Sequence, residues 1–105
     1  MKIRIITGDV IVVSRHPAFL EFLKEIGLVD ENTPIISHAD PSEISGKTVI
    51  TSGIPLHLAA LAKRVITVDL ALPPELRGEE LTVEDMKKYL KGITEYEVRK
   101  IKTIK

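Results

Sequence analysis

Apolar residues follow two different spacings along this chain, and the spacing changes repeatedly. Residues 10–13 form an unbroken β-branched run, which is typical of a strand buried on both faces of a sheet. The apolar residues that follow recur at helical spacing between Pro17, which suits a first helical turn, and Gly27, which suits a helix end. The pattern therefore predicts a strand followed by a helix in this first part of the chain.

The same two patterns alternate through the rest of the chain. Thr82, with acids directly after it, is typical of a helix N-cap, and we expect Gly92 to end that helix. The patterns predict strands at residues 2–7, 10–13, 33–38, 48–51, 64–72 and 94–104, and helices at residues 17–26, 40–43, 55–63 and 82–90. The turn signal Gly8-Asp9 leaves open whether the first two strands form a hairpin or one bent strand.

Strands separated by helices and short loops predict an α/β fold. We expect one domain over residues 1–105, built on an open, mostly parallel sheet with helices on its faces. Ligands of such sheets bind at the carboxyl ends of the strands, near the point where the strand order switches. Two loops of the chain are therefore candidates for a site.

The first loop, Ser14-Arg15-His16-Pro17, joins the buried strand to the first helix. A helix N-terminus attracts anions, the Arg15 guanidinium suits phosphate, and the His16 imidazole exchanges protons near neutral pH. These residue types favour a site for a phosphate-bearing ligand. In the alternative interpretation, Ser14 is only an N-cap and Arg15 is only a surface charge.

The second loop, Ser52-Gly53-Ile54-Pro55, follows the strand at residues 48–51. Gly53 allows close approach of a ligand or a positive φ, and Pro55 leaves the Ile54 N–H free to face an anion. His57 lies in the first turn after it. The same letters also fit ordinary loop punctuation. Neither a Walker A motif nor a GxGxxG motif is present, so these routes to nucleotide binding find no support.

Two further groups leave alternatives open. His38 and Asp40 either orient a catalytic imidazole or metal ligand, or form a structural hydrogen bond in which Asp40 caps the next helical turn. Arg77, after a stiff Pro-Pro turn, either reaches the ligand or pairs with the neighbouring Glu79 or Glu80. The three histidines do not have the spacing of a metal triad, so we expect neither a metal nor a cofactor.

Composition excludes several classes of function. The chain has no cysteine, which excludes disulfides, thiolate zinc sites, iron–sulfur clusters and cysteine nucleophiles. Fifteen basic and fifteen acidic residues cancel, which excludes the basic coat of a duplex nucleic acid binder. No long apolar run or signal peptide is found, so we expect no membrane partner and a cytoplasmic protein. The four basic residues among residues 99–105 are either a solvated end or a surface for an anionic partner.

Several short motifs in one order resemble a known family. They are Ser14-Arg15-His16-Pro17, His38-Ala39-Asp40, Gly53-Ile54-Pro55-Leu56-His57-Leu58-Ala59, Leu70-Ala71-Leu72-Pro73 and Arg77-Gly78-Glu79-Glu80-Leu81-Thr82. Over about residues 10–98 the chain resembles the small Csx-sixteen family associated with type III CRISPR systems. It departs from the family in its N-terminal strand, in Ala18 where the family usually has glycine, and in its basic C-terminal end.

The resemblance implies a ring nuclease with a Rossmann-like, CARF-like domain. Such proteins act as homodimers, bind cyclic oligoadenylate (most often cyclic tetra-adenylate) and cut it without a metal, which switches the defence off. The ribose 2′-hydroxyl would attack the adjacent phosphorus and leave a 2′,3′-cyclic phosphate. We expect Arg15 and His16 to be catalytic, and Ser14, Ser52, Gly53, Ile54, His57 and Arg77 to bind the substrate.

Three other functions remain as alternatives. A non-catalytic sensor would bind the cyclic nucleotide and pass the signal through its basic end. A structural or assembly protein would bind no nucleotide. A metal-dependent nuclease or phosphatase would lose its activity in a chelator.

Overall fold

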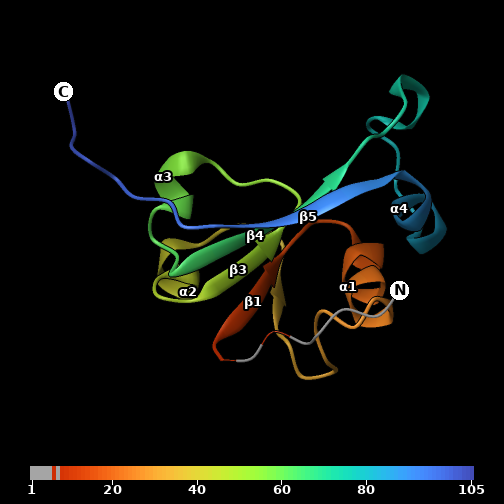
Figure 1. Cartoon of the computed structure of the whole chain (residues 1–105), viewed down its shortest axis with the longest axis horizontal. Coiled ribbons are helices and arrows are strands. Elements are labelled where there is room, and N and C mark those ends of the chain that lie inside the picture. The colour runs from red at the N-terminus through yellow and green to blue at the C-terminus, as the bar shows by residue number, and fades with distance from the viewer. Residues whose placement is uncertain (1–5, 7) are drawn as a thin grey trace.

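The β-branched runs form one sheet in the computed structural model, which describes residue 6 and residues 8–105 (Figure 1). Its strands are β1 (Val10–Val13), β2 (Ile35–Ile36), β3 (Thr48–Thr51), β4 (Arg64–Leu70) and β5 (Leu90–Tyr96). The helices are α1 (Pro17–Glu25), α2 (Pro41–Ile44), α3 (Leu56–Ala59), α4 (Val83–Tyr89) and the 3₁₀ turn η1 (Pro74–Leu76).

The order of the strands across the sheet is β2-β1-β3-β4-β5. The first four strands run parallel, and β5 is antiparallel to β4. The chain passes from β1 to β2 on one side and then returns to β3 on the other side of β1, so the strand order switches between β1 and β3. This arrangement confirms the predicted Rossmann-like, mostly parallel α/β sheet.

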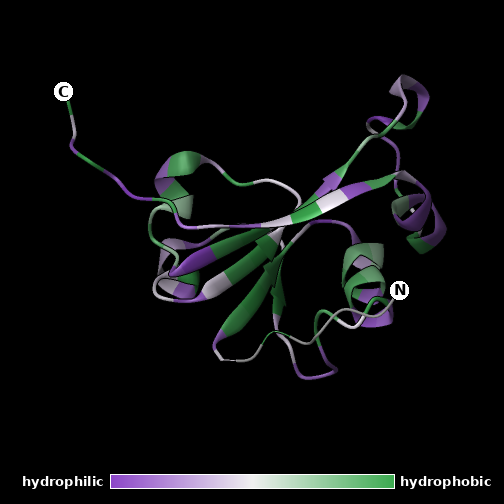
Figure 2. Cartoon of the chain, in the orientation of Figure 1, coloured by the Kyte–Doolittle hydropathy of each residue, from purple (hydrophilic) through white to green (hydrophobic). Residues whose placement is uncertain are grey.

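Helices cover both faces of the sheet, as Figure 1 shows. On one face, Phe22 of α1 and Met86 of α4 pack against Val12 of β1. On the other face, Ile44 of α2 and Ala59 of α3 belong to a second cluster, whose buried strand residues are Ile11, Val13, Val49 and Val65. Because both faces are covered, β1 is apolar throughout and β3 is apolar at its two central residues (Figure 2).

Helix α1 begins and ends where the sequence predicts. Pro17 is its first residue, and Gly27 follows it with a φ of 80°, a conformation that disfavours residues with a Cβ. The Leu28 N–H then donates to the Leu23 carbonyl at 3.0 Å, which closes the helix end. The Phe19 and Phe22 side chains are buried, so this helix is fixed to the sheet directly behind the Ser14–His16 loop.

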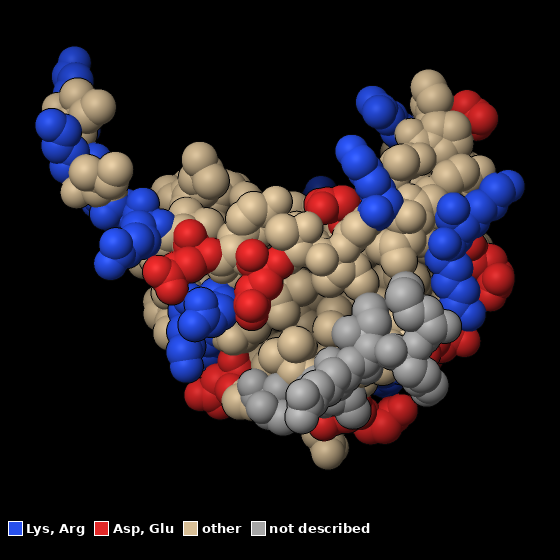
Figure 3. All heavy atoms as spheres, in the orientation of Figure 1, with Lys and Arg blue, Asp and Glu red and all other residues tan. Residues whose placement is uncertain are grey.

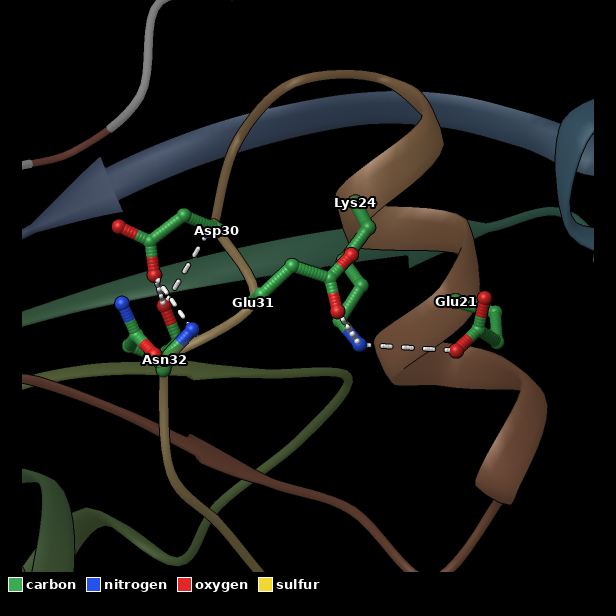
Figure 4. Close-up of polar contacts among 6 residues, drawn as sticks. Glu21, Lys24, Asp30, Glu31 and Asn32 are labelled. Atoms are coloured by element: carbon green, nitrogen blue, oxygen red, sulfur yellow. Dashed lines mark hydrogen bonds and ion pairs between the residues drawn. The ribbon is translucent and has the colours of Figure 1, made fainter.

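An ion-pair cluster secures the connection between α1 and β2 (Figure 4). The Lys24 ammonium lies 3.2 Å from a Glu31 oxygen and 3.6 Å from a Glu21 oxygen. The hydrogen bond to Glu31, helped by the charge of both carboxylates, raises the pKa of Lys24 above its usual value. Both carboxylates are largely exposed, so water and salt screen the contribution of this cluster to stability. That contribution is present below the ordinary pKa of lysine and is lost as the pH rises through the raised value.

The helix predicted at residues 55–63 is shorter than expected, because α3 ends at Ala59. The Leu61 N–H bonds the Leu58 carbonyl in a tight turn, and the Lys63 N–H donates to the Lys47 carbonyl at 2.8 Å. This bond to the segment before β3 draws the chain out of the helix and into β4. The strand predicted at residues 33–38 likewise shrinks to Ile35–Ile36, which pair only with the end of β1.

The last helix and strand also differ from the prediction. Gly92 does not end a helix; α4 passes directly into β5, and Gly92 lies inside that strand opposite Asp69. The predicted final strand at residues 94–104 ends at Tyr96, because Tyr96 pairs with Val65 and β4 begins one residue before Val65. Residues 97–105, here called the C-terminal arm, form no helix or strand.

Two other predictions concern the ends of elements. The strand predicted at residues 64–72 ends at Leu70, because its partner β5 begins opposite it at Leu90. The Ala71 N–H bonds the carbonyl of Tyr89, the last residue of α4, at 2.8 Å. The strand predicted at residues 2–7, and with it the choice between a hairpin and a bent strand, lies outside the described residues apart from Ile6. The Ile6 N–H donates to the Leu28 carbonyl at 3.1 Å.

We expect Thr82→Ala to destabilise the fold. The Thr82 hydroxyl accepts from the Asp85 N–H at 3.1 Å, and the Asp85 carboxylate accepts from the Thr82 N–H at 3.1 Å, so the two residues form a capping box. Removing the hydroxyl should lower the free energy of unfolding by about 1 kcal/mol in urea denaturation. Thr82→Ser keeps the acceptor and should retain most of the stability. Equal stability of the two variants would contradict a capping role.

Candidate functional site

Three strand ends meet at one edge of the sheet. Val13, the last residue of β1, pairs with Ile36 of β2 and with Thr51 of β3, and each is the final residue of its strand. Parallel strands that end in register bring the residues after them to the same place. A serine follows each of the three strands, at Ser14, Ser37 and Ser52.

These strand ends surround a hollow of about 160 Å³. Its lining consists of Val13, Ser14, Arg15, His16, Ser37, Thr51, Ser52 and Gly53. We call this set the strand-end hollow. It contains hydroxyls, one guanidinium and one imidazole, and it contains no carboxylate, so it presents donors and positive charge to an anion. It lies where the strand order switches, which is the usual ligand position in a sheet of this kind.

The first loop is arranged by local hydrogen bonds. The His16 N–H donates to the Ser14 hydroxyl at 3.1 Å, and the Ser14 N–H donates to the Ile36 carbonyl at 3.0 Å, which ties the loop to β2. His16 is the N-cap of α1, but its side chain makes no capping hydrogen bond, so the imidazole is available to a ligand. The N-cap of α1 is therefore His16, and the alternative interpretation that assigned this role to Ser14 is wrong.

Arg15 is exposed, and no carboxylate of the described residues lies within ion-pair distance of it. Arg15 thus lines the hollow without a neutralising partner. The partial positive charge of the α1 N-terminus adds to this field. The electrostatics of the hollow favour a negatively charged group.

The second loop uses one of its own donors internally. Thr51 is buried, and its hydroxyl accepts from the Gly53 N–H at 3.2 Å while it donates to the Gly53 carbonyl at 3.0 Å. The Ile54 N–H makes no hydrogen bond with any of the described residues, as the sequence predicted. Gly53 does not adopt a positive φ, and open space lies where its Cβ would be. Of the two reasons for glycine here, close approach of a ligand is the one compatible with the backbone.

A second pocket, of about 250 Å³, adjoins the strand-end hollow and shares His16 and Ser52 with it. Its other lining residues are apolar: Phe19, Val68, Leu70, Leu72, Leu81 and Met86. We call this second space the apolar pocket. Together the two spaces offer an anion-binding part and an apolar part that meet at two residues.

The structure brings together five of the eight site residues predicted from the sequence: Ser14, Arg15, His16, Ser52 and Gly53. The other three lie elsewhere. Ile54 is half-buried and packs against the α2 and α3 side of the core. His57 lines a separate groove of about 580 Å³ beside the C-terminal arm. Arg77 follows η1 and lines neither of the two spaces described above.

Sequence reasoning missed Ser37, Thr51 and the apolar pocket. Ser37 directly follows β2, so the rule that led to Ser14 and Ser52 also applies to it. The predicted strand extended through His38 and concealed this position. No sequence signal marks the apolar pocket, because its walls come from α1, β4, α4 and the segment between β4 and α4.

Asp40 has a structural role. Its carboxylate accepts from the Ser42 hydroxyl at 2.8 Å and the Ser42 N–H at 2.9 Å, which caps α2 as one interpretation of the sequence predicted. These two hydrogen bonds lower the pKa of Asp40 below its usual value. The stability that this cap contributes is therefore present above the ordinary pKa of aspartate and is lost as the pH falls through the lowered value.

Two absences hold for residue 6 and residues 8–105, the part of the chain that the structure describes. No group of three histidine or acidic side chains there is placed to hold a metal ion. Within the same residues, no helix has the length and apolar character needed to cross a membrane.

Comparison with known proteins identifies the family. The chain shows no significant match to a curated protein or to a solved structure. Residues 11–99 match the family described as "Putative CRISPR-associated protein (Cas_VVA1548)". The match includes both loops of the strand-end hollow and all five strands except the first residue of β1. The chain therefore belongs to this family of CRISPR-associated proteins.

Proposed function

We propose that this protein is a ring nuclease that binds cyclic oligoadenylate, with cyclic tetra-adenylate as the first candidate, and cleaves it. The observation that carries the proposal is the strand-end hollow, in which Arg15, His16 and Ser52 come from two loops and face one space. The family is associated with CRISPR, and the sequence motifs resemble the Csx-sixteen family of type III systems. A phosphodiester ligand fits the donors and the positive charge of this hollow.

In the proposed reaction, the ribose 2′-hydroxyl loses its proton to water as its oxygen attacks the adjacent phosphorus, and the bond from the phosphorus to the 5′-oxygen breaks. The products are a 2′,3′-cyclic phosphate and a free 5′-hydroxyl. The protein holds the 2′-oxygen, the phosphorus and the 5′-oxygen in line. Arg15 stabilises the charge that develops on the phosphoryl oxygens, assisted by the hydroxyls of the hollow.

His16 is the proposed general acid. It protonates the departing 5′-oxygen, which would otherwise leave as a costly alkoxide. Its imidazole lines the hollow and makes no capping hydrogen bond. His57 was the other candidate from the sequence, but it lies in the groove beside the C-terminal arm. The structure thus favours His16 over His57 for this role.

We further propose a homodimer. The described residues offer one self-complementary segment, residues 95–105. Glu95 and Glu97 lie at its start, and the four basic residues of the arm follow them. Two antiparallel copies would therefore bring the acidic start of one against the basic end of the other.

Exposure and shape support this pairing. Ile101 and Ile104 of the arm are 94% and 90% exposed, and the arm extends away from the body with its basic side chains outward (Figure 3). The groove beside it presents Leu56, which is 76% exposed. β5 is an edge strand with no neighbour on its outer side among the described residues. A second copy would cover these apolar groups and this edge.

We expect the purified protein to convert cyclic tetra-adenylate into linear products in the presence of a chelator. In single-turnover assays His16→Ala should lose roughly 10²–10⁴-fold in rate, the usual contribution of a general acid. Arg15→Ala should lose more rate than His57→Ala, because only Arg15 faces the hollow. His57→Ala is the matched control, a histidine of similar chemistry outside the hollow.

Three results would contradict this assignment. A larger loss with His57→Ala than with Arg15→Ala would move the site to the groove beside the arm. Binding of the intact ring without cleavage would make the protein a sensor. Activity that the chelator abolishes would make it a metal-dependent enzyme.

The dimer is tested by exchanging charges between the two halves of residues 95–105. One double variant is Lys102→Glu with Lys105→Glu, and the other is Glu95→Lys with Glu97→Lys. Each should be monomeric in sedimentation equilibrium at low salt, because like charges then face each other. An equimolar mixture should recover the dimer, since both contacts become attractive again. The control variant carries Lys63→Glu with Lys88→Glu, two substitutions at exposed lysines outside residues 95–105, and it should remain dimeric. A mixture that stays monomeric, or a monomeric native chain, would contradict the proposed interface.

A further inference from the structure

We propose that the groove beside the C-terminal arm holds the arm of a second copy, and that this contact fixes the loop that carries Ser52 and Gly53. The inference rests on the proposed function, because it takes the homodimer and the strand-end hollow from there. It adds the place where the partner's arm lies and a dependence of the hollow on the dimer. Figure 1 shows the arm running past α3 before it leaves the body, and residues of both line the groove.

The lining of the groove is apolar and basic, and it includes no carboxylate. Leu56 and Leu61 are 76% and 42% exposed, so their side chains are accessible to a partner. Arg99, Lys100 and His57 are exposed as well and supply the basic groups. A segment that carries apolar and acidic side chains therefore complements this lining.

Residues 95–105 of a second copy form such a segment. Ile101 and Ile104 are almost fully exposed, and neither lines the groove of its own chain. Glu95 is exposed and forms no ion pair with the described residues. Residues 98–105 make no backbone hydrogen bond with the rest of the described chain, so their backbone is open to pairing with another extended segment.

The groove and the strand-end hollow lie at the two ends of one short segment. Residues 52–53 line the hollow and residues 56–57 line the groove, so only residues 54–55 separate the two. The Ile54 side chain packs against the same apolar cluster as Val98 of the arm. Contact in the groove therefore acts on the loop of the hollow over a short distance.

Helix α3 has little to hold it in the single chain. It has four residues, of which only Ala59 is buried. The Ala59 N–H donates to the Pro55 carbonyl at 2.9 Å, and the Ala60 N–H donates to the Leu56 carbonyl at 3.0 Å. A helix this short is not stable by itself, and segments with few buried side chains open most readily. A partner arm that covers Leu56 would stabilise α3 and the loop before it.

Two variants remove the contact from either side. Ile101→Gln with Ile104→Gln changes the arm, and Leu56→Gln changes the groove. Each should weaken the dimer about tenfold or more in sedimentation equilibrium, because the dimer then covers less apolar surface. These side chains are largely exposed in the single chain, so both variants should fold. The control is Ile35→Gln, at an exposed residue on the opposite edge of the sheet, and it should dimerise like the native chain.

Hydrogen exchange tests the effect on α3 without any nucleotide. In the ¹⁵N-labelled full-length protein, the Ala59 and Ala60 amides should exchange about tenfold or more faster in the monomeric Ile101→Gln, Ile104→Gln variant than in the native dimer. The Met86 amide, which donates to the Thr82 carbonyl in α4, is the internal reference and should be unchanged. Dilution of the native chain until it dissociates gives the same comparison without a substitution.

Single-turnover cleavage of cyclic tetra-adenylate should slow by about tenfold or more in the same variant, since its Ser52–Gly53 loop is less well held. A dimer that tolerates Leu56→Gln, or Ile101→Gln with Ile104→Gln, would overturn the place of the partner's arm. Equal exchange of Ala59 and Ala60 in monomer and dimer would overturn the dependence of the loop on the dimer. If exchange changes as expected but neither form cleaves the ring, the proposed reaction fails and the inference about the groove stands.

Discussion

The common end of three parallel strands is the constraint on which the rest of the site depends. Val13, Ile36 and Thr51 end their strands in one register, so the residues after them emerge at one point of the sheet. A shift of one residue between β1 and β3 would turn their apolar side chains to the opposite faces. The buried β-branched runs therefore fix the place of the loops as well as the core.

This geometry lets a neutral protein present a local anion site. The chain has no net charge, yet the strand-end hollow gathers a guanidinium and the N-terminus of α1 and holds no carboxylate. Local arrangement of a few groups, rather than the total charge, sets the field that a small anion meets. The adjoining apolar pocket shares His16 and Ser52 with the hollow.

Much of the fold and part of the site could be predicted from the sequence. Uninterrupted β-branched runs identify buried parallel strands, and Pro17 and Gly27 mark the limits of α1 because each has a strong local preference. The loops at Ser14 and Ser52 follow from the rule for strand ends. These signals depend on neighbouring residues in the sequence and not on long-range pairing, so they predict the structure correctly.

The failures involve long-range pairing. Gly92 is a good helix terminator in isolation, but β4 offers a partner strand and Gly92 pairs with Asp69. The length of α3 is set by the bond from Lys63 to Lys47, and the extent of β2 by its single neighbour. The apolar pocket forms only when α4 packs beside α1, so no short stretch of sequence predicts it.

The most direct test is a crystal structure of the full-length protein with a 2′-deoxy analogue of cyclic tetra-adenylate, which lacks the attacking hydroxyl and stays intact. We predict a phosphate between Arg15 and Ser52 in the strand-end hollow. A ring bound instead in the groove beside the C-terminal arm, with the strand-end hollow free of ligand, would contradict it.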